Sequence, residues 1–146
     1  MELPRLVELS FPGTFTGFEQ AFARLRGALD DVDLQPATRF NVELVFEEIV
    51  ANIVRYGGEP DRELAVSVWL ELNGESIVLT FRDNGRPFDP RERADPAPPT
   101  SLEDARVGGL GVMLVRRVAT GLDYCRTSDE HNQLIVTLAA KPRALS

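Results

Sequence analysis

Glu48 and Asn52 stand among apolar neighbours in a stretch at residues 40–56 that is apolar enough to be buried on more than one side. In a helix, positions four apart lie on one face, one turn apart. Burying a bare carboxylate or amide costs a few kcal/mol or more, so both side chains must reach solvent or face a polar site. On a solvated stripe they would lie beside Glu43 and Glu47. In a cleft, the Asn52 oxygen is a suitable Mg²⁺ ligand, and the Glu48 carboxylate can take a proton from a nucleophile.

A second candidate group is Asp83-Asn84-Gly85, which directly follows an apolar strand-like segment. Asp83 at the end of a strand can accept a hydrogen bond from an exocyclic amine. Gly85, two residues on, lets a ligand approach the backbone closely. The same three residues also form ordinary turns, so this segment alone fits either interpretation.

The third candidate is the run Gly108-Gly109-Leu110-Gly111, which opens a helix predicted at residues 109–119. Backbone N–H groups at a helix N-terminus attract anions, and glycines allow close contact with a phosphate. The spacing matches neither the P-loop nor the dinucleotide fingerprint, and a flexible linker is the alternative interpretation.

Two helices should position the first candidates. Thr16 and Glu19 have the spacing of a capping box. After Thr16, apolar residues recur at helical steps: Phe18, Phe22, Leu25 and Leu29, with Phe15 just before. Pro36 suits the first turn of a second helix that runs to about Tyr56, where Gly57-Gly58 ends it.

Five segments are predicted to be strands, at residues 5–11, 64–72, 76–82, 123–127 and 133–139. Asn73-Gly74 between the second and third indicates a tight hairpin. Residues 84–107 hold five of the ten prolines among many charges, which is typical of a lid or linker. The order β-α-α-β-β-lid-α-β-β predicts an α+β two-layer sandwich, with a mixed, mostly antiparallel sheet and helices on one face.

Composition limits the class of protein. The 146 residues carry a net charge of −7 without a Lys/Arg run, which argues against nucleic-acid binding. One cysteine, Cys125, cannot form an internal disulfide, and no apolar stretch reaches the roughly 18 residues that a membrane span needs. We therefore expect one soluble cytoplasmic domain over residues 1–146, with Cys125 and Trp69 in its core.

The three candidates together, in this order, resemble the Bergerat-fold (GHKL) ATPase superfamily, which includes gyrase and the histidine kinases. The shared pieces are E-x-x-x-N on a helix, D-x-G after a strand, a proline-rich loop and G-G-L-G opening a helix. Within that superfamily, the small size, F-D-P after D-x-G, and V-G-G-L-G-V-M-L-V-R-R are most similar to the stand-alone anti-sigma-factor serine/threonine kinases.

The resemblance implies a role for each candidate residue. Asn52 would hold Mg²⁺, and Glu48 would be the catalytic general base. Asp83 would accept from the adenine amine, Gly85 would keep that pocket open, and residues 84–107 would form the ATP lid. Phosphates would be bound at the helix-opening run Gly108, Gly109, Leu110 and Gly111.

The implied function is an ATP- and Mg²⁺-dependent protein serine kinase that phosphorylates an antagonist protein and sequesters a sigma factor or similar target, with a possible homodimer. The alternatives are a non-catalytic ATP-dependent binding module and a nucleotide-free adaptor. Three positions depart from the family pattern: Pro87 replaces a second glycine, Arg55-Tyr56 stands near an expected histidine, and His131-Asn132 replaces a Gly-Thr pair.

Overall fold

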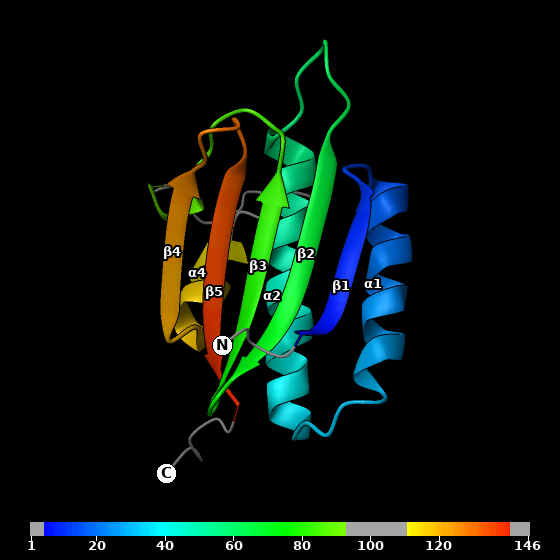
Figure 1. The fold of residues 1–146 in the computed structure, drawn as a ribbon, viewed down its shortest axis with the longest axis vertical. Coiled ribbons are helices and arrows are strands. Elements are labelled where there is room, and N and C mark those ends of the chain that lie inside the picture. The colour runs from blue at the N-terminus through cyan, green and yellow to red at the C-terminus, as the bar shows by residue number, and fades with distance from the viewer. Residues whose placement is uncertain (1–4, 93–110, 141–146) are drawn as a thin grey trace, which may run out of the picture.

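The computed structural model describes residues 5–92 and 111–140. Within them, a five-stranded sheet of order β1-β2-β3-β5-β4 carries helices α1, α2 and α4 on one face (Figure 1). Every strand pairing described is antiparallel. The predicted α+β two-layer sandwich is confirmed, but over the described residues the sheet is wholly antiparallel rather than mixed. No helix in these ranges is long and apolar enough to cross a membrane.

The strands and helices follow the predicted order closely. Their bounds are β1 (Arg5–Pro12), α1 (Phe15–Leu29), α2 (Pro36–Tyr56), β2 (Ala65–Asn73), β3 (Ser76–Asp83), the short 3-10 helix η1 (Pro90–Glu92), α4 (Gly111–Val118), β4 (Gly121–Arg126) and β5 (Asn132–Ala139).

The hairpin between β2 and β3 turns at Gly74 and Glu75. Asn73 is still paired, opposite Ser76, and Gly74 has a φ of 61°. A positive φ at the first central residue is the type II′ pattern, for which glycine is best suited. The predicted hairpin is therefore confirmed, with its turn one residue later than the Asn73-Gly74 signal.

Helix α1 begins earlier than the capping-box pattern indicated. Its N-cap is Thr14, whose hydroxyl accepts from the Gly17 N–H at 2.9 Å. Thr16 lies inside the first turn, so the predicted cap at Thr16 is wrong. Only Thr16 has a glutamate three residues on, but the turn after Pro12, in which the Thr14 N–H donates to the Pro12 carbonyl at 2.8 Å, starts the helix at the earlier threonine.

The core lies between the sheet and the helices. Its centre is Phe46 of α2, which is fully buried, and four rings surround it with centroids 5.9–6.4 Å away: Phe11, Phe18, Phe22 and Phe81. Such aromatic contacts add to the free energy gained from burying apolar area. They fix α2 against β3, the two elements that carry the candidate side chains.

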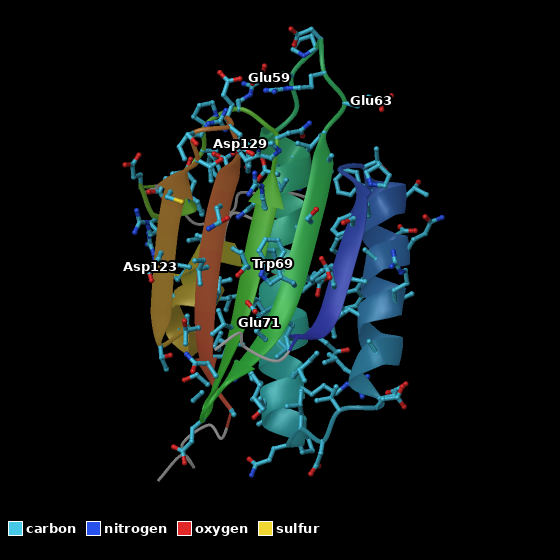
Figure 2. The ribbon with its side chains drawn as sticks, in the orientation of Figure 1. Glu59, Glu63, Trp69, Glu71, Asp123 and Asp129 are labelled. Carbon is cyan, nitrogen blue, oxygen red and sulfur yellow. The ribbon has the colours of Figure 1, made fainter. Side chains whose placement is uncertain are left out.

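The opposite face of the sheet carries no helix among the described residues. Alternation along β2 points Val66, Val68 and Leu70 toward the helices and Trp69 away from them (Figure 2). Trp69 is only half-buried, and Cys125 of β4 is exposed. The expectation that both are core residues is wrong, because each occupies the outward phase of its strand.

Candidate functional site

A narrow pocket lies at one end of the sheet, between the second half of α2 and the end of β3. Its wall comes from both layers and from the segment after β3: Ile49, Asn52, Ile53, Phe81, Asp83, Phe88, Pro90, Tyr124, Asn132 and Leu134. The cavity volume is about 20 Å³, room for about one water molecule. A purine would therefore enter only if part of this wall, such as Phe88 and Pro90, moved outward.

Asn52 projects from α2 into this pocket without a partner. Its side chain is 3% exposed, and neither its amide nitrogen nor its amide oxygen has a hydrogen bond. An unpaired buried polar group typically costs about 1–3 kcal/mol, and native structures contain few of them. The amide of Asn52 is therefore free to pair with a polar group that enters the pocket.

Glu48 lies one turn before Asn52 and touches the start of α4. A Cβ built on Gly111 would lie 2.3 Å from the Glu48 Oε2 atom, so a larger residue here would displace the carboxylate from its present position. Burial raises the pKa of Glu48, the neighbouring Glu47 raises it further, and the positive charge of Arg55 opposes both. The structure thus brings Gly111 and Glu48 together, from segments far apart in the sequence.

Asp83 ends β3 at the pocket wall and is 4% exposed. Its Oδ1 atom accepts from the Gly85 N–H at 2.9 Å and from the Asn132 amide at 3.0 Å. No hydrogen bond from a described residue reaches Oδ2. Burial raises the pKa of Asp83, while hydrogen bonds from Asn132 and Gly85 and the charge of Arg126 lower it. One carboxylate oxygen is therefore held and the other is available.

Gly85 allows the chain after β3 to pass close to the end of α2. A Cβ here would lie 2.5 Å from the Gly57 carbonyl oxygen and 2.9 Å from Asp83 Oδ1. The next residue, Arg86, donates its backbone N–H to the same Gly57 carbonyl at 3.1 Å. The glycine is thus needed for packing at the pocket rim, in addition to any contact with a ligand.

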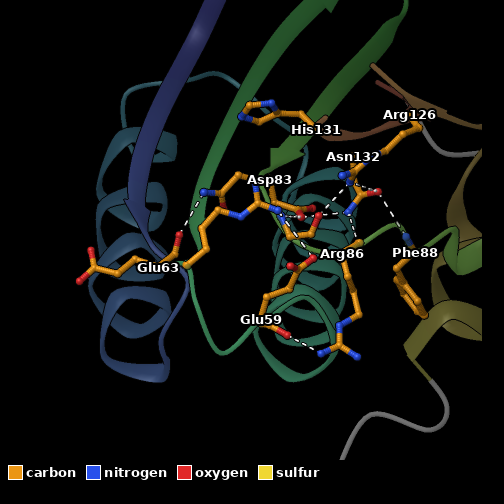
Figure 3. A network of polar contacts seen from close by, with 12 residues as sticks. Glu59, Glu63, Asp83, Arg86, Phe88, Arg126, His131 and Asn132 are labelled. Atoms are coloured by element: carbon orange, nitrogen blue, oxygen red, sulfur yellow. Dashed lines mark hydrogen bonds and ion pairs between the residues drawn. The ribbon is translucent and has the colours of Figure 1, made fainter. Parts of the chain in front are cut away.

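Asn132, at the start of β5, also lines the pocket. From the sequence it stood out only as a departure from the family pattern, with no role assigned. It pairs with Asp83 in the antiparallel register of β3 and β5, and its side chain lies at the centre of a polar network (Figure 3). Residues 83 and 132 are joined only by the sheet, so no local sequence signal could have linked them.

Arg55 lies outside the residues that line the pocket, but its positive charge acts on Glu48, two turns earlier on α2, and the sequence did not reveal this. It follows Asn52 by three positions on α2, and its Nη1 atom is buried with no hydrogen-bond partner. The next residue, Tyr56, stacks on Phe88 with ring centroids 5.6 Å apart. Helical spacing from Glu48 through Asn52 to Arg55 was the signal that could have found it.

The structure places most of the predicted site in one region. Asn52 and Asp83 line the pocket, Gly85 lies beside Asp83, and Gly111 lies against Glu48. Gly108, Gly109 and Leu110 lie outside the described residues, and so do residues 93–107 of the predicted lid. The helix-borne amide and the strand-end acid converge as the joint motif order predicted.

An antiparallel sheet backed by helices, with an amide from α2 and an acid from β3 meeting in one pocket, defines a Bergerat-type ATP-binding domain. Comparison of sequences agrees with this class. The family model of the histidine kinase-like ATPase domain matches residues 11–138, and the chain belongs to this family.

Two known proteins are similar over most of the chain. The serine/threonine-protein kinase BtrW of Bordetella bronchiseptica is 32% identical over 106 residues, which is 73% of this chain and 74% of that protein. A chain in the crystal structure of the SiaB-SiaC complex from Pseudomonas aeruginosa matches with a TM-score of 0.65 and 18% identity, covering 92% of this chain and 89% of that one. The second match shows likeness of fold.

Proposed function

We propose that this chain is an ATP- and Mg²⁺-dependent protein serine/threonine kinase of the partner-switching, anti-sigma type. The observation that carries the proposal is Asn52, a buried amide with no partner, in the same pocket as a buried acid. Membership of an ATPase family and 32% identity to a serine/threonine-protein kinase support it.

The residues present fit a magnesium ion bound together with nucleotide phosphates. Asn52 offers a hard amide oxygen with no competing hydrogen bond. The described residues contain no cluster of three or more His, Cys, Asp or Glu side chains that could hold a metal by themselves. Mg²⁺ commonly takes few protein ligands and completes its shell with phosphates and water. Bound there, it would neutralise charge on the phosphate oxygens.

The sheet and the helical layer would each contribute contacts to the nucleotide. Asp83 would accept a hydrogen bond from the adenine amine through its available Oδ2 atom. The α4 N-terminus, with Gly108, Gly109, Leu110 and Gly111, would donate backbone N–H groups to the phosphates. Residues 84–107 would form the lid over the bound nucleotide.

Glu48 would act as the general base. As the substrate hydroxyl oxygen forms its bond to the γ-phosphorus, the bond to the ADP oxygen breaks, and the hydroxyl proton passes to the Glu48 carboxylate. Burial raises the pKa of Glu48, so its ionised form is a stronger base than a solvated carboxylate. Positioning and charge neutralisation supply most of the rest of phosphoryl-transfer catalysis.

The protein partners are inferred from the relatives. One relative is named as a protein kinase, and the matched solved structure is a complex of two proteins, SiaB and SiaC. We propose an antagonist protein as the phosphorylated substrate and a sigma factor or similar regulator as the sequestered target, with a homodimer as the possible assembly.

The alternative is a non-catalytic module that binds ATP and grips a partner without transferring phosphate. Glu48 favours the kinase, since a pure binder needs no half-buried carboxylate pressed against the glycine that opens α4. The two functions differ in one measurable property, which is transfer of the γ-phosphoryl group.

The test combines calorimetric titration with Mg-ATP and a radiolabel transfer assay against antagonist candidates encoded beside this gene. We expect Glu48→Gln to lower transfer by roughly 10²–10⁴-fold with ATP affinity nearly unchanged. Glu47→Gln, at an exposed neighbouring position on the same helix, leaves burial, the larger cause of the raised Glu48 pKa, in place and should lower transfer only slightly. ATP binding without transfer to a partner that demonstrably binds would favour the non-catalytic module.

A further inference from the structure

The Asn132 side chain uses its full hydrogen-bonding capacity inside the pocket wall. Its amide nitrogen donates to Asp83 Oδ1 at 3.0 Å and to the Arg86 carbonyl at 2.8 Å. Its Oδ1 atom accepts from the Phe88 N–H at 3.3 Å, from Arg126 Nη1 at 3.2 Å and from the Tyr124 hydroxyl. An asparagine amide has two donor hydrogens, and both are used.

The partners fix which way this amide points. Three donors surround the oxygen, and two acceptors surround the nitrogen, so a flipped amide would set donor against donor and acceptor against acceptor. Asn132 is 6% exposed, and Arg126 braces the same wall by donating to the Gly85 carbonyl at 2.8 Å. The side chain is thus held from three parts of the chain: the end of β3, the residues that follow it, and β4.

We propose that Asn132 is a positioning residue that sets the selectivity of the pocket for a 6-aminopurine, acting through Asp83. This inference rests on the proposed ATP-binding function. The Asn132 amide and the Gly85 N–H both donate to Oδ1 of Asp83. They leave Oδ2 as the acceptor that the exocyclic amine would meet, and a carboxylate held by two donors pays little reorientation entropy on binding.

Asn132 does not contact the base itself in this arrangement, because all its polar atoms already have partners. The same side chain also holds the backbone of Arg86 and Phe88, and the Phe88 ring lines the pocket and stacks on Tyr56. Asn132 therefore connects Asp83, which would bind the amine, to the segment of Arg86 and Phe88, which forms another part of the pocket wall.

The test compares the affinity for ATP with that for purine riboside triphosphate, which carries hydrogen in place of the 6-amino group. We expect wild type to prefer ATP by roughly tenfold or more, the worth of a hydrogen bond to a buried carboxylate. Asn132→Asp keeps the shape and the accepting oxygen but removes the donor to Asp83, and Asn132→Ala removes it without adding charge. Both variants should reduce the ATP preference to about threefold or less.

Gln133→Ala is the matched control, because Gln133 is the next residue of β5 and its side chain projects from the opposite face of the sheet. It should retain the wild-type preference. Variants are compared only after thermal unfolding confirms a cooperative fold. A second measurement uses the wild-type protein. The side-chain amide NMR signals of Asn132 should shift more on adding ATP than on adding the analogue.

Equal loss of affinity for the two nucleotides in the variants, or equal NMR shifts in wild type, would overturn the inference and leave the proposed function standing. A wild-type protein that binds ATP without preferring it over the analogue would overturn the role of Asp83 and this inference with it. Absence of ATP binding in wild type would overturn the proposed function itself.

Discussion

The two walls of the pocket differ in how their polar groups are satisfied. On the sheet side, Asp83 and Asn132 are buried and bonded to each other and to neighbouring backbone. On the α2 side, neither the amide nitrogen nor the amide oxygen of Asn52 has a hydrogen-bond partner.

This difference indicates that the sheet wall holds groups in position, whereas the α2 wall offers unpaired groups to a ligand. A satisfied network is rigid and contributes to stability, and it holds an acceptor in a fixed place before any ligand arrives. Unpaired buried groups lower stability, and a ligand that pairs with them gains the free energy that folding left unrealised. In the proposed function, the sheet wall would orient the base, whereas Asn52 of the α2 wall would hold the metal.

The largest expected effect comes from exchanging the two asparagines for leucine. Asn52→Leu should keep or raise the free energy of unfolding, by up to about 1–2 kcal/mol, since it removes an unpaired buried amide. It should also weaken Mg-ATP binding by roughly 100-fold or more, the cost of losing a metal ligand and its charge neutralisation. Chemical denaturation and calorimetry measure the two quantities.

The matched variant on the other wall is Asn132→Leu. It leaves Asp83, Tyr124 and Arg126 without their shared partner, so the free energy of unfolding should fall by about 2 kcal/mol or more. A loss of stability of the same size in Asn52→Leu would remove the contrast between the walls. It would indicate that Asn52 supports the fold and not a ligand.

The sequence was informative where a signal is local. The strands and helices followed from period-2 and helical patterns, and the pair Glu48–Asn52 followed from helical spacing. The side of a strand that faces the core cannot be deduced from the local sequence. Trp69, for example, was predicted to be a core residue but lies on the outward-facing side of β2. The phase depends on which strands pair and which face the helices cover.

The candidate site divides in the same way. Asp83 and Asn52 were found from motif order, whereas the bond between Asp83 and Asn132 depends on the register of β3 with β5. The contact between Gly111 and Glu48 likewise depends on how α4 packs on α2. Tertiary packing decides these contacts, and no pattern in one chain segment encodes them.

A smaller effect is expected at the glycine that touches the α2 wall. Gly111→Ala introduces a Cβ 2.3 Å from Glu48 Oε2, and the carboxylate must move away. Because the end of a flexible side chain can swing aside, the free energy of unfolding should change by less than about 1 kcal/mol. The rate of phosphoryl transfer should fall roughly 10–100-fold, since the base is displaced. Transfer assays and thermal unfolding test the pair of outcomes.

Gly27 of α1 provides the control for this substitution, since a Cβ there meets nothing within 4 Å. Gly27→Ala should leave transfer unchanged and raise the free energy of unfolding by up to about 1 kcal/mol. Transfer by Gly111→Ala at the wild-type rate would show that the position of the Glu48 carboxylate is unimportant for catalysis.

The smallest effect is a pH dependence of stability that belongs to the α2 wall. Burial raises the pKa of Glu48 above its ordinary value of 4.5. The folded state therefore binds this proton more tightly than the unfolded state, and the stabilisation is fully present below pH 4.5 and is lost as pH rises through the raised pKa. Glu48→Gln does not titrate, so its stability relative to wild type should increase with pH across that window. The increase should stay below about 1 kcal/mol, because solvent screens a half-exposed carboxyl.

Glu47→Gln sharpens this measurement, because Glu47 is the charged neighbour that adds to the raised pKa of Glu48. Removing its charge lowers the folded-state pKa of Glu48 toward the ordinary value, so the loss of stability should end at lower pH and be smaller than in wild type. Denaturation curves at pH 4–8 for wild type and both variants give the comparison. A relative stability of Glu48→Gln that decreases with rising pH would mean that the folded state favours the ionised carboxylate. Burial would then not be the dominant influence on this residue, and Glu48 would be a weaker base than the proposed mechanism requires.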